Sequence, residues 1–311
     1  MKILVFGAGA IGSAFGGFLS PFHDVTLLGR PRHLETIRKR GLRVEGIWGN
    51  HRFSNFHLAV DAASLFRSKP VFHLILITVK SYDTVEAARF LQGKIGGETL
   101  LLSLQNGIGN VEILHRFLPP RQVLAGRVIT GVEMEPGKIR VTVTADKIRL
   151  GETTVKRVTP RVKTLARIFS KGGLPATAVA DVQKYLWAKL IYNCVLNPLA
   201  SLLGVPYGTL SEWGSTRFLM DEIIREAYRV AARKRVKLDP PTAEGYRQLF
   251  YRKLVPETYG HHPSMLQDLR QGKQTEIEAM NGELVRLGRA VSISTPFNRL
   301  LTELIYFREE R

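Results

Sequence analysis

The 311-residue sequence predicts an α/β protein in which a parallel sheet flanked by helices is followed by an all-helical domain. Apolar strands alternate with helix-compatible stretches through the first half of the chain, which is typical of a doubly wound sheet. From about Asp181 onward, apolar residues recur at spacings of three and four, as in residues 182–203 and 276–289. Because a chain of this length commonly divides into two domains, we expect one at residues 1–175 and another at residues 176–311.

The first turn of the chain carries a nucleotide-binding pattern. An apolar run ends at Phe6, and Gly-Ala-Gly-Ala-Ile-Gly follows at residues 7–12, so G-x-G-x-x-G lies between a strand and a helix. Gly7 permits a tight turn, Gly9 lets backbone approach a pyrophosphate, and Gly12 lets the helix pack close to the strand. The phosphates would then meet unpaired N–H groups and the positive end of the helix dipole. The pattern predicts a Rossmann fold that binds a dinucleotide.

Two other interpretations of this segment compete with the first. Lys2 and the mostly apolar stretch up to Leu19 resemble a secretory signal, although five glycines would weaken a signal helix. The second alternative is a glycine-rich turn in an unrelated α/β domain, and the next strand argues against it.

That next strand indicates which dinucleotide is preferred. It covers residues 24–29 and ends at Arg30-Pro31-Arg32, where NAD-dependent folds usually carry an acidic residue for the ribose 2′-hydroxyl. An arginine at this position accommodates the 2′-phosphate of NADP through its planar, two-pronged guanidinium. The alternative is an ordinary solvated arginine, since the chain has 45 Lys and Arg residues. Its position at the end of the strand favours Arg30 over Arg32 as the residue that binds the 2′-phosphate.

Further elements complete the expected sheet. Residues 74–79 and 99–104 read as buried parallel strands, and residues 84–91 read as a helix. Residues 138–150 resemble a hairpin at the far end of the sheet, with a short polar turn at residues 144–146.

Composition restricts the class of protein. Hydrophobic content of 44% and charged content of 23% are typical of a soluble globular protein, and no apolar stretch reaches the length of a membrane span. A single cysteine, Cys194, excludes an intramolecular disulfide and fits the reducing cytoplasm. The net charge of +18 could serve nucleic-acid binding, but the basic residues form no block. We therefore expect a cytoplasmic protein that binds neither nucleic acid nor membrane.

A row of polar residues interrupts the apolar helix expected at residues 182–203. Lys189, Asn193 and Asn197 lie at i, i+4 and i+8, so they share one helix face. Burying them unpaired would cost a few kcal/mol each, so they need partners or an open cleft. A stripe exposed to water is an equally good interpretation of the spacing. Pro198 lies within this helix or at its end. Because proline has no N–H, it leaves a backbone carbonyl upstream without its helical hydrogen bond.

Another polar cluster lies near the C-terminus. Ser264 and Thr275 are candidate helix caps, while Asp268 and Glu276 could equally be surface carboxylates. The pair His261-His262 lacks a nearby ligand set, so we expect no metal site.

Taken together, these motifs resemble those of the ketopantoate reductases, also called 2-dehydropantoate 2-reductases. The resemblance runs nearly from end to end, and the order and spacing of its motifs match across both expected domains. The motifs are residues 7–12, Val79-Lys80, Gln105-Asn106-Gly107, the row Lys189, Asn193, Asn197 and Pro198, the segment from Ser264 to Thr275-Glu276, and Thr295-Pro296 with Asn298.

The resemblance implies NADPH-dependent reduction of the 2-oxo group of 2-dehydropantoate to (R)-pantoate, on the route to pantothenate and coenzyme A. It implies that Lys189 is the general acid that protonates the carbonyl oxygen, where negative charge develops, and that Glu276 orients the lysine or the substrate. We expect a cleft between the two domains to hold NADPH and the oxo acid. The implied catalytic residues are Lys189 and Glu276, the substrate-binding residues are Asn106, Asn193, Asn197 and Ser264, and the cofactor-binding residues are Gly7, Gly9, Ala10, Ile11, Gly12, Arg30, Lys80, Asn106 and Glu276.

The chain departs from the resemblance near the expected substrate tail. Pro263 precedes Ser264 where many relatives carry another serine, and residues 235–262 are basic and rich in proline and tyrosine. A related NADPH-dependent reductase of another 2-oxo acid is therefore the alternative enzyme. A non-catalytic NADPH sensor is the alternative from another class, although it would need neither Lys189 nor Glu276. A homodimer is compatible with the sequence.

Overall fold

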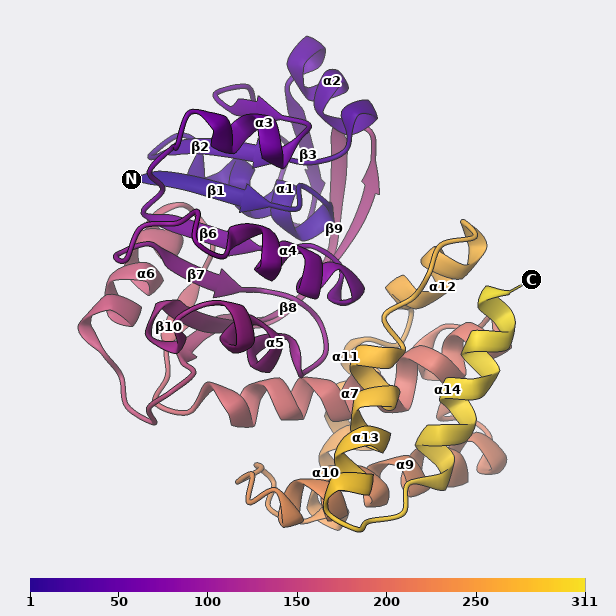
Figure 1. Cartoon of the computed structure of the whole chain (residues 1–311). Helices are drawn as coiled ribbons and strands as arrows, with labels where there is room; N and C mark the ends of the chain where they lie inside the picture. The colour runs from indigo at the N-terminus through magenta and orange to yellow at the C-terminus, as the bar shows by residue number, and fades with distance from the viewer. Residues whose placement is uncertain (311) are drawn as a thin grey trace. The chain divides into compact units, whose positions relative to one another are not determined.

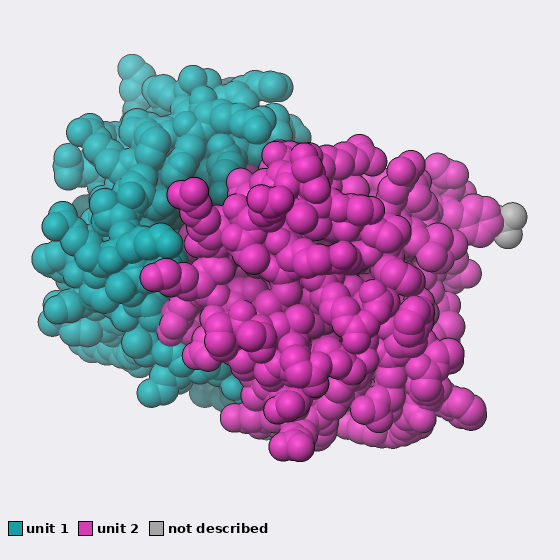
Figure 2. Space-filling model, turned by 90° about the horizontal axis from the view of Figure 1, so that it is seen from below, with its two compact units in different colours: residues 1–105, 110–182 teal, residues 106–109, 183–311 magenta. Residues whose placement is uncertain are grey.

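The computed structural model describes residues 1–310 and divides into two compact units (Figures 1 and 2). Unit 1 comprises Met1–Gln105 and Asn110–Val182, and unit 2 comprises Asn106–Gly109 and the chain from Gln183 onward. Four residues of the first half of the chain, Asn106–Gly109, therefore belong to the second unit.

Unit 1 is built on a ten-stranded sheet in the order β4-β3-β9-β8-β7-β6-β1-β2-β5, with β10 paired to β9. The pairs β8–β9 and β3–β4 are antiparallel and the other pairs are parallel. The strand bounds are β1 Lys2–Phe6, β2 Asp24–Leu28, β3 Leu42–Gly46, β4 His51–Phe53, β5 His57–Ala59, β6 Leu74–Ile77, β7 Leu100–Ser103, β8 Val123–Glu135, β9 Lys138–Glu152 and β10 Ala176–Ala178.

Helices pack on both faces of this sheet, as the doubly wound prediction requires (Figure 1). On one face, Phe15 of α1 and Phe169 of α6 meet edge to face with ring centroids 5.6 Å apart. On the other, Phe66 of α3 and Phe90 of α4 meet at 5.4 Å. The prediction of a Rossmann domain is confirmed. The helix bounds are α1 Ala10–Leu19, α2 Pro31–Arg40, α3 Ala62–Arg67, α4 Thr84–Leu91, α5 Asn110–Phe117 and α6 Pro160–Lys171, with short turns η1 Ser81–Asp83 and η2 Pro120–Gln122.

The prediction of a hairpin within residues 138–150 is wrong. That segment belongs to one long strand, β9, whose antiparallel partner is β8, and the tight turn lies at residues 136–137. Ile129 pairs with Asp146 and Thr130 with Thr144, so Ala145 is an extra residue in the ladder. A bulge of this kind tolerates polar residues inside a strand, which is why the sequence resembled a turn. The sheet also continues past residue 175, because β10 joins it.

Unit 2 is all-helical, as predicted, with its own apolar core around the long helix α7 (Figure 1). The helix bounds are α7 Val182–Leu203, α8 Tyr207–Leu210, α9 Gly214–Arg233, α10 Ala243–Leu249, α11 Val255–Glu257, α12 Ser264–Arg270, α13 Glu283–Ala290 and α14 Pro296–Glu309, with π-helical turns η3 Phe250–Leu254 and η4 Glu278–Gly282.

Helix α7 corrects the expectation that no apolar stretch reaches membrane-spanning length. Its 22 residues are long and apolar enough to cross a membrane by length and composition alone. However, 61% of its most apolar window is buried inside the protein, as expected for the core helix of a helical domain. The apolarity of α7 is explained by its place in the core.

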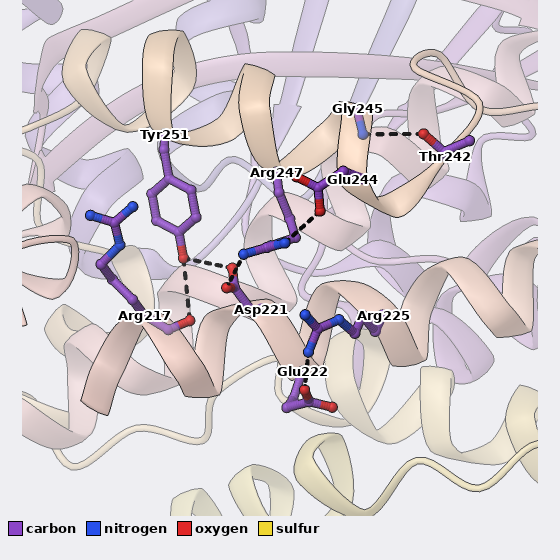
Figure 3. A network of polar contacts seen from close by, with 9 residues as sticks. All are labelled: Arg217, Asp221, Glu222, Arg225, Thr242, Glu244, Gly245, Arg247 and Tyr251. Atoms are coloured by element: carbon purple, nitrogen blue, oxygen red, sulfur yellow. Dashed lines mark hydrogen bonds and ion pairs between the residues drawn. The ribbon is translucent and has the colours of Figure 1, made fainter. Parts of the chain in front are cut away.

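A polar network ties part of the segment at residues 235–262 to the preceding helix (Figure 3). Arg247 of α10 donates to Asp221 of α9 and to Glu244, both at 2.5 Å, and Tyr251 of η3 donates to Asp221 at 2.9 Å. The guanidinium of Arg217 lies 4.5 Å from the centre of the Tyr251 ring. Asp221 therefore ties α10 and η3 to α9.

Candidate functional site

The glycine-rich loop of unit 1 is shaped by two glycines that the fold itself requires. Gly7 has a φ of +110°, and a Cβ there would lie 2.6 Å from the backbone nitrogen of Val79. A Cβ on Gly12 would lie 2.3 Å from the Gly7 carbonyl oxygen, because α1 packs directly against the loop. At Gly9, in contrast, the nearest atom to an added Cβ is that same oxygen, at 4.0 Å. The space in front of Gly9 is not filled by the protein.

The start of α1 fits a dinucleotide pyrophosphate. Gly9 is the residue that caps the helix, and it has no side chain to bond the first N–H groups of α1. Ala10 and Ile11 form the first turn, are partly exposed, and carry no negative charge. Unpaired N–H groups and the positive helix end form a site for an anion.

Arg30 lies beside this loop in the sheet. The backbone N–H groups of Gly7 and Ala8 donate to the carbonyl of Leu28, the last residue of β2, at 3.1 and 2.7 Å. Arg30 follows two residues later, caps α2 with an extended backbone, and has an exposed side chain. This is the position expected for a residue that distinguishes the two ribose forms.

The loop that carries Lys80 is held by two buried side chains: Gln105, which belongs to one of the motifs of the sequence, and Thr84, which sequence reasoning did not single out. Gln105 donates to the carbonyl of Val79 at 3.1 Å, and the hydroxyl of Thr84 bonds the carbonyl of Ser81 at 2.7 Å. Gln105 also donates to Thr84 at 2.7 Å. The residues on both sides of Lys80 are thus fixed through their carbonyl groups.

Three of the expected site residues meet inside unit 2. The Lys189 ammonium donates to Asn106 Oδ1 at 2.6 Å, and Asn106 Nδ2 donates to Glu276 Oε2 at 3.3 Å. Glu276 is buried at 6% exposure, while Lys189 and Asn106 are partly exposed. The Asn106 amide therefore bridges a cation and a carboxylate, and both of its ends are oriented by them.

Asn106 reaches this cluster because residues 106–109 dock on unit 2. The N–H of Ile108 donates to the carbonyl of Ala279 at 3.1 Å. Gly107 has a φ of +78°, and a Cβ there would lie 2.2 Å from the same carbonyl oxygen. No larger residue fits this approach.

The two other polar residues of the α7 row are buried, which removes the interpretation of a water-exposed stripe. Asn193 is 8% exposed, and its side chain has no hydrogen-bond partner among residues 1–310. Asn197 is 4% exposed, accepts from the Tyr207 hydroxyl at 2.5 Å, and approaches Met280 Sδ at 3.5 Å. Asn193 is consequently the residue of this row whose amide is open to a ligand.

The other residues singled out from the sequence differ in their burial and in their hydrogen bonds. Ser264 is exposed at the start of α12, and no hydrogen bond described for residues 1–310 links it to Lys189. Pro263 occupies the cap position of α12, so the expected Ser264 cap is wrong, whereas Thr275 Oγ1 accepts from the N–H of Ile277 at 3.2 Å. Cys194 is fully buried, and burial raises the pKa of its thiol. Within residues 1–310, no group of His, Cys, Asp and Glu could hold a metal ion.

Comparison with known proteins shows that this chain is similar to oxidoreductases. A family model described as "Ketopantoate reductase PanE/ApbA" matches residues 3–154, and its C-terminal counterpart matches residues 181–309. The chain is 38% identical to a 2-dehydropantoate 2-reductase of Aquifex aeolicus, over 99% of this chain and 97% of that protein. It is 33% identical to one from Pyrococcus horikoshii, over 99% and 98%. The chain belongs to the ketopantoate reductase family.

Solved structures agree with this assignment. A PanE/ApbA family ketopantoate reductase from Ralstonia eutropha aligns with a TM-score of 0.87 and 32% identity, over 100% of this chain and 99% of that one. A D-mandelate dehydrogenase, in a ternary structure with NADH and anilino(oxo)acetate, aligns with the same TM-score and coverage at 27% identity. The family is therefore one of oxidoreductases that act on small molecules, and a nicotinamide cofactor is consistent with this neighbour.

Proposed function

We propose that this protein reduces 2-dehydropantoate to (R)-pantoate with NADPH, in the cytoplasm. The observation that carries the proposal is the bridge from Lys189 through Asn106 to Glu276. It holds an ammonium group, partly exposed, beside a buried carboxylate. The curated relatives named 2-dehydropantoate 2-reductase support the choice of substrate.

Unit 1 would hold the cofactor. The pyrophosphate would lie at the start of α1, against Gly9, Ala10 and Ile11, in the space that the missing Cβ of Gly9 leaves. Arg30 would bond the 2′-phosphate, and Lys80 would bond the ribose on the nicotinamide side. When bound, NADPH supplies the hydride that adds to C2 of the oxo acid.

Lys189 would act as the general acid. Its ammonium group would donate a hydrogen bond to the oxo oxygen and then a proton, as negative charge develops there. Asn106 Oδ1 accepts from Nζ at 2.6 Å and so orients the ammonium group. Glu276 would orient Asn106 through the bond from Asn106 Nδ2 to Glu276 Oε2.

The substrate would be held by amide and hydroxyl groups. Asn193 lies one helical turn after Lys189, so its open amide would bond a substrate hydroxyl close to the reacting carbon. Asn197, one turn further, would act near the substrate tail, and Ser264 would bond the carboxylate. Since the residues proposed to hold the pyrophosphate and the 2′-phosphate belong to unit 1 and the proposed acid belongs to unit 2, turnover needs both units.

The test is NADPH oxidation measured against a panel of 2-oxo acids, with Lys189→Ala as the diagnostic variant. We expect 2-dehydropantoate to give the highest kcat/KM, and Lys189→Ala to lower kcat by roughly two to four orders of magnitude with little change in NADPH affinity. Lys184→Ala, on the same helix, is the matched control and should keep native turnover. A Lys189→Ala variant with near-native kcat would remove this lysine from the mechanism.

The same panel distinguishes the alternative functions. The likeness to a D-mandelate dehydrogenase favours including 2-oxo acids with aromatic tails, and NADH as well as NADPH. A preference for such a substrate would identify a reductase of another 2-oxo acid. A protein that binds NADPH tightly but does not oxidise it in the presence of any of these 2-oxo acids would be a sensor instead.

The remaining partners follow from this proposal. We expect a small 2-oxo acid as the substrate, neither nucleic acid nor membrane as a partner, and assembly compatible with a homodimer. Light scattering after size exclusion, repeated with added DNA, RNA or lipid vesicles, measures each of these properties.

A further inference from the structure

Helix α7 contains an unusual break in its hydrogen bonding. Pro198 lies inside the helix and has no N–H, so the carbonyl four residues earlier, that of Cys194, loses its normal helical partner. Cys194 is fully buried, so water cannot replace that partner readily. A buried carbonyl of this kind requires a donor from elsewhere in the chain.

The donor is Asn281, in the π-helical turn η4. Its Nδ2 donates to the Cys194 carbonyl oxygen at 3.0 Å and to Asn298 Oδ1 at 2.9 Å, and Asn281 is fully buried. Asn298 Nδ2 donates in turn to the carboxylate of Glu226 at 2.7 Å. Glu226 Oε2 also accepts the backbone N–H of Asn298 at 3.0 Å, so the Asn298 amide presents Nδ2 to Glu226 and Oδ1 to Asn281.

The segment from Glu276 to η4 also carries the contacts that assemble the proposed site. Glu276 precedes η4 and accepts from Asn106. Ala279, within η4, accepts the N–H of Ile108 and thereby places residues 106–109. Two members of the Lys189 cluster thus depend on this segment, while the third lies on α7.

We infer that Asn281 is a positioning residue, which locks the segment 276–282 to α7 through the carbonyl that Pro198 frees. The lock holds Glu276 at bonding distance from Asn106, and Asn106 at bonding distance from Lys189. This inference rests on the proposed function for its catalytic part. Its structural part is the pairing of Asn281 with the carbonyl that Pro198 leaves without a helical partner. This part can be tested by thermal unfolding, with no measurement of enzyme activity.

Four proteins test the inference: the native chain, Asn281→Ala, Pro198→Ala and the double variant. Alanine at position 198 supplies the missing N–H, so the Cys194 carbonyl regains a helical partner. Asn281→Ala should therefore lower the unfolding temperature strongly when Pro198 is present and less when it is introduced into the Pro198→Ala variant. Equal drops in both backgrounds would overturn the pairing.

Turnover separates positioning from stability. We expect Asn281→Ala to lower kcat by about 10- to 100-fold, the effect of misplacing a reacting group by about 1 Å, with an unchanged KM for NADPH. The double variant should recover stability but not kcat. Recovery of kcat together with stability would reduce Asn281 to a structural role and overturn the inference. If Asn281→Ala does not fold, the kcat of the double variant is compared with that of Pro198→Ala. A lower kcat in the double variant supports the positioning role of Asn281, and an equal kcat overturns it.

A matched control removes a buried amide that belongs to the other unit. Gln122 in unit 1 is buried and donates to the carbonyls of Gly96 and Thr99 at 2.7 and 2.9 Å. Gln122→Ala should lower the unfolding temperature and leave kcat unchanged. If the native chain reduces no 2-oxo acid, the proposed function fails, whereas the unfolding comparison still tests the pairing of Asn281 with Cys194.

Discussion

Replacing Gly9 by alanine should weaken cofactor binding without weakening the fold. The backbone at Gly9 has φ −83° and ψ −159°, an extended conformation that any residue can adopt. An added methyl group would meet no atom closer than the Gly7 oxygen at 4.0 Å, which is ordinary van der Waals contact. Nothing inside the protein therefore explains a glycine here. A ligand that approaches the backbone explains it.

The size of the effect follows from the bonds that the methyl group would prevent. Pushing a pyrophosphate away from the start of α1 would remove one or two charge-assisted hydrogen bonds from backbone N–H groups, at about 1.5–3 kcal/mol each. That loss corresponds to a rise in the Kd for NADPH of roughly 10- to 100-fold or more. The free energy of unfolding without cofactor should change by less than about 0.5 kcal/mol.

The assay is titration of NADPH fluorescence, paired with thermal unfolding of the cofactor-free protein. Gly97→Ala is the control, because an added Cβ there has no neighbour within 4 Å and Gly97 is exposed, away from the loop. Gly97→Ala should change neither Kd nor Tm. A Gly9→Ala variant that binds NADPH normally would refute the placement of the pyrophosphate, and a large loss of Tm would refute the argument from free space.

Three further outcomes are expected. Arg30→Ala should raise the Kd for NADPH and leave that for NADH nearly unchanged; equal losses would show that Arg30 does not read the 2′-phosphate. Thr84→Val should lower NADPH affinity by about tenfold because it frees the loop around Lys80, while Thr84→Ser restores binding. Thr99→Val, which removes a similar buried bond to the Phe72 carbonyl at 2.7 Å, should cost stability alone. Burial lowers the pKa of His33 below its usual 6.5, so unfolded chains bind more protons in acid and stability falls as the pH drops below about 6.5. His33→Gln should flatten the stability profile between about pH 7 and pH 5, and an unchanged profile would contradict this cause.

Local patterns predicted the Rossmann half of the fold. The glycine-rich turn is encoded within twelve residues. A side chain at Gly7 would collide with Thr78 and Val79, which follow β6, and one at Gly12 would collide with Gly7, Thr78 and Val5. The expected helix at residues 84–91 coincides with α4. The prediction of a hairpin was wrong because similar polar residues occur in a β-bulge and in a turn. Only the pairing of this segment with β8 distinguishes the two.

The assignment of residues 106–109 to unit 2 could not be predicted from the sequence. These residues follow strand β7 of unit 1, so the order of elements places them with the Rossmann sheet. Their attachment depends on the hydrogen bond from the N–H of Ile108 to the carbonyl of Ala279, two residues that are far apart in the sequence. A contact of that kind has no local pattern.

The polar row on α7 nevertheless contained a usable hint about the rest of unit 2. Spacing alone could not decide whether Lys189, Asn193 and Asn197 face water or the core. Once the surrounding helix is judged apolar enough to be buried, the row and the carbonyl freed by Pro198 need polar partners from another helix. The structure supplies several of them from residues 276–281, at Glu276 through Asn106, at Met280 and at Asn281. A buried polar row on one helix thus predicts a complementary polar segment elsewhere, and here that segment carries the proposed catalytic carboxylate.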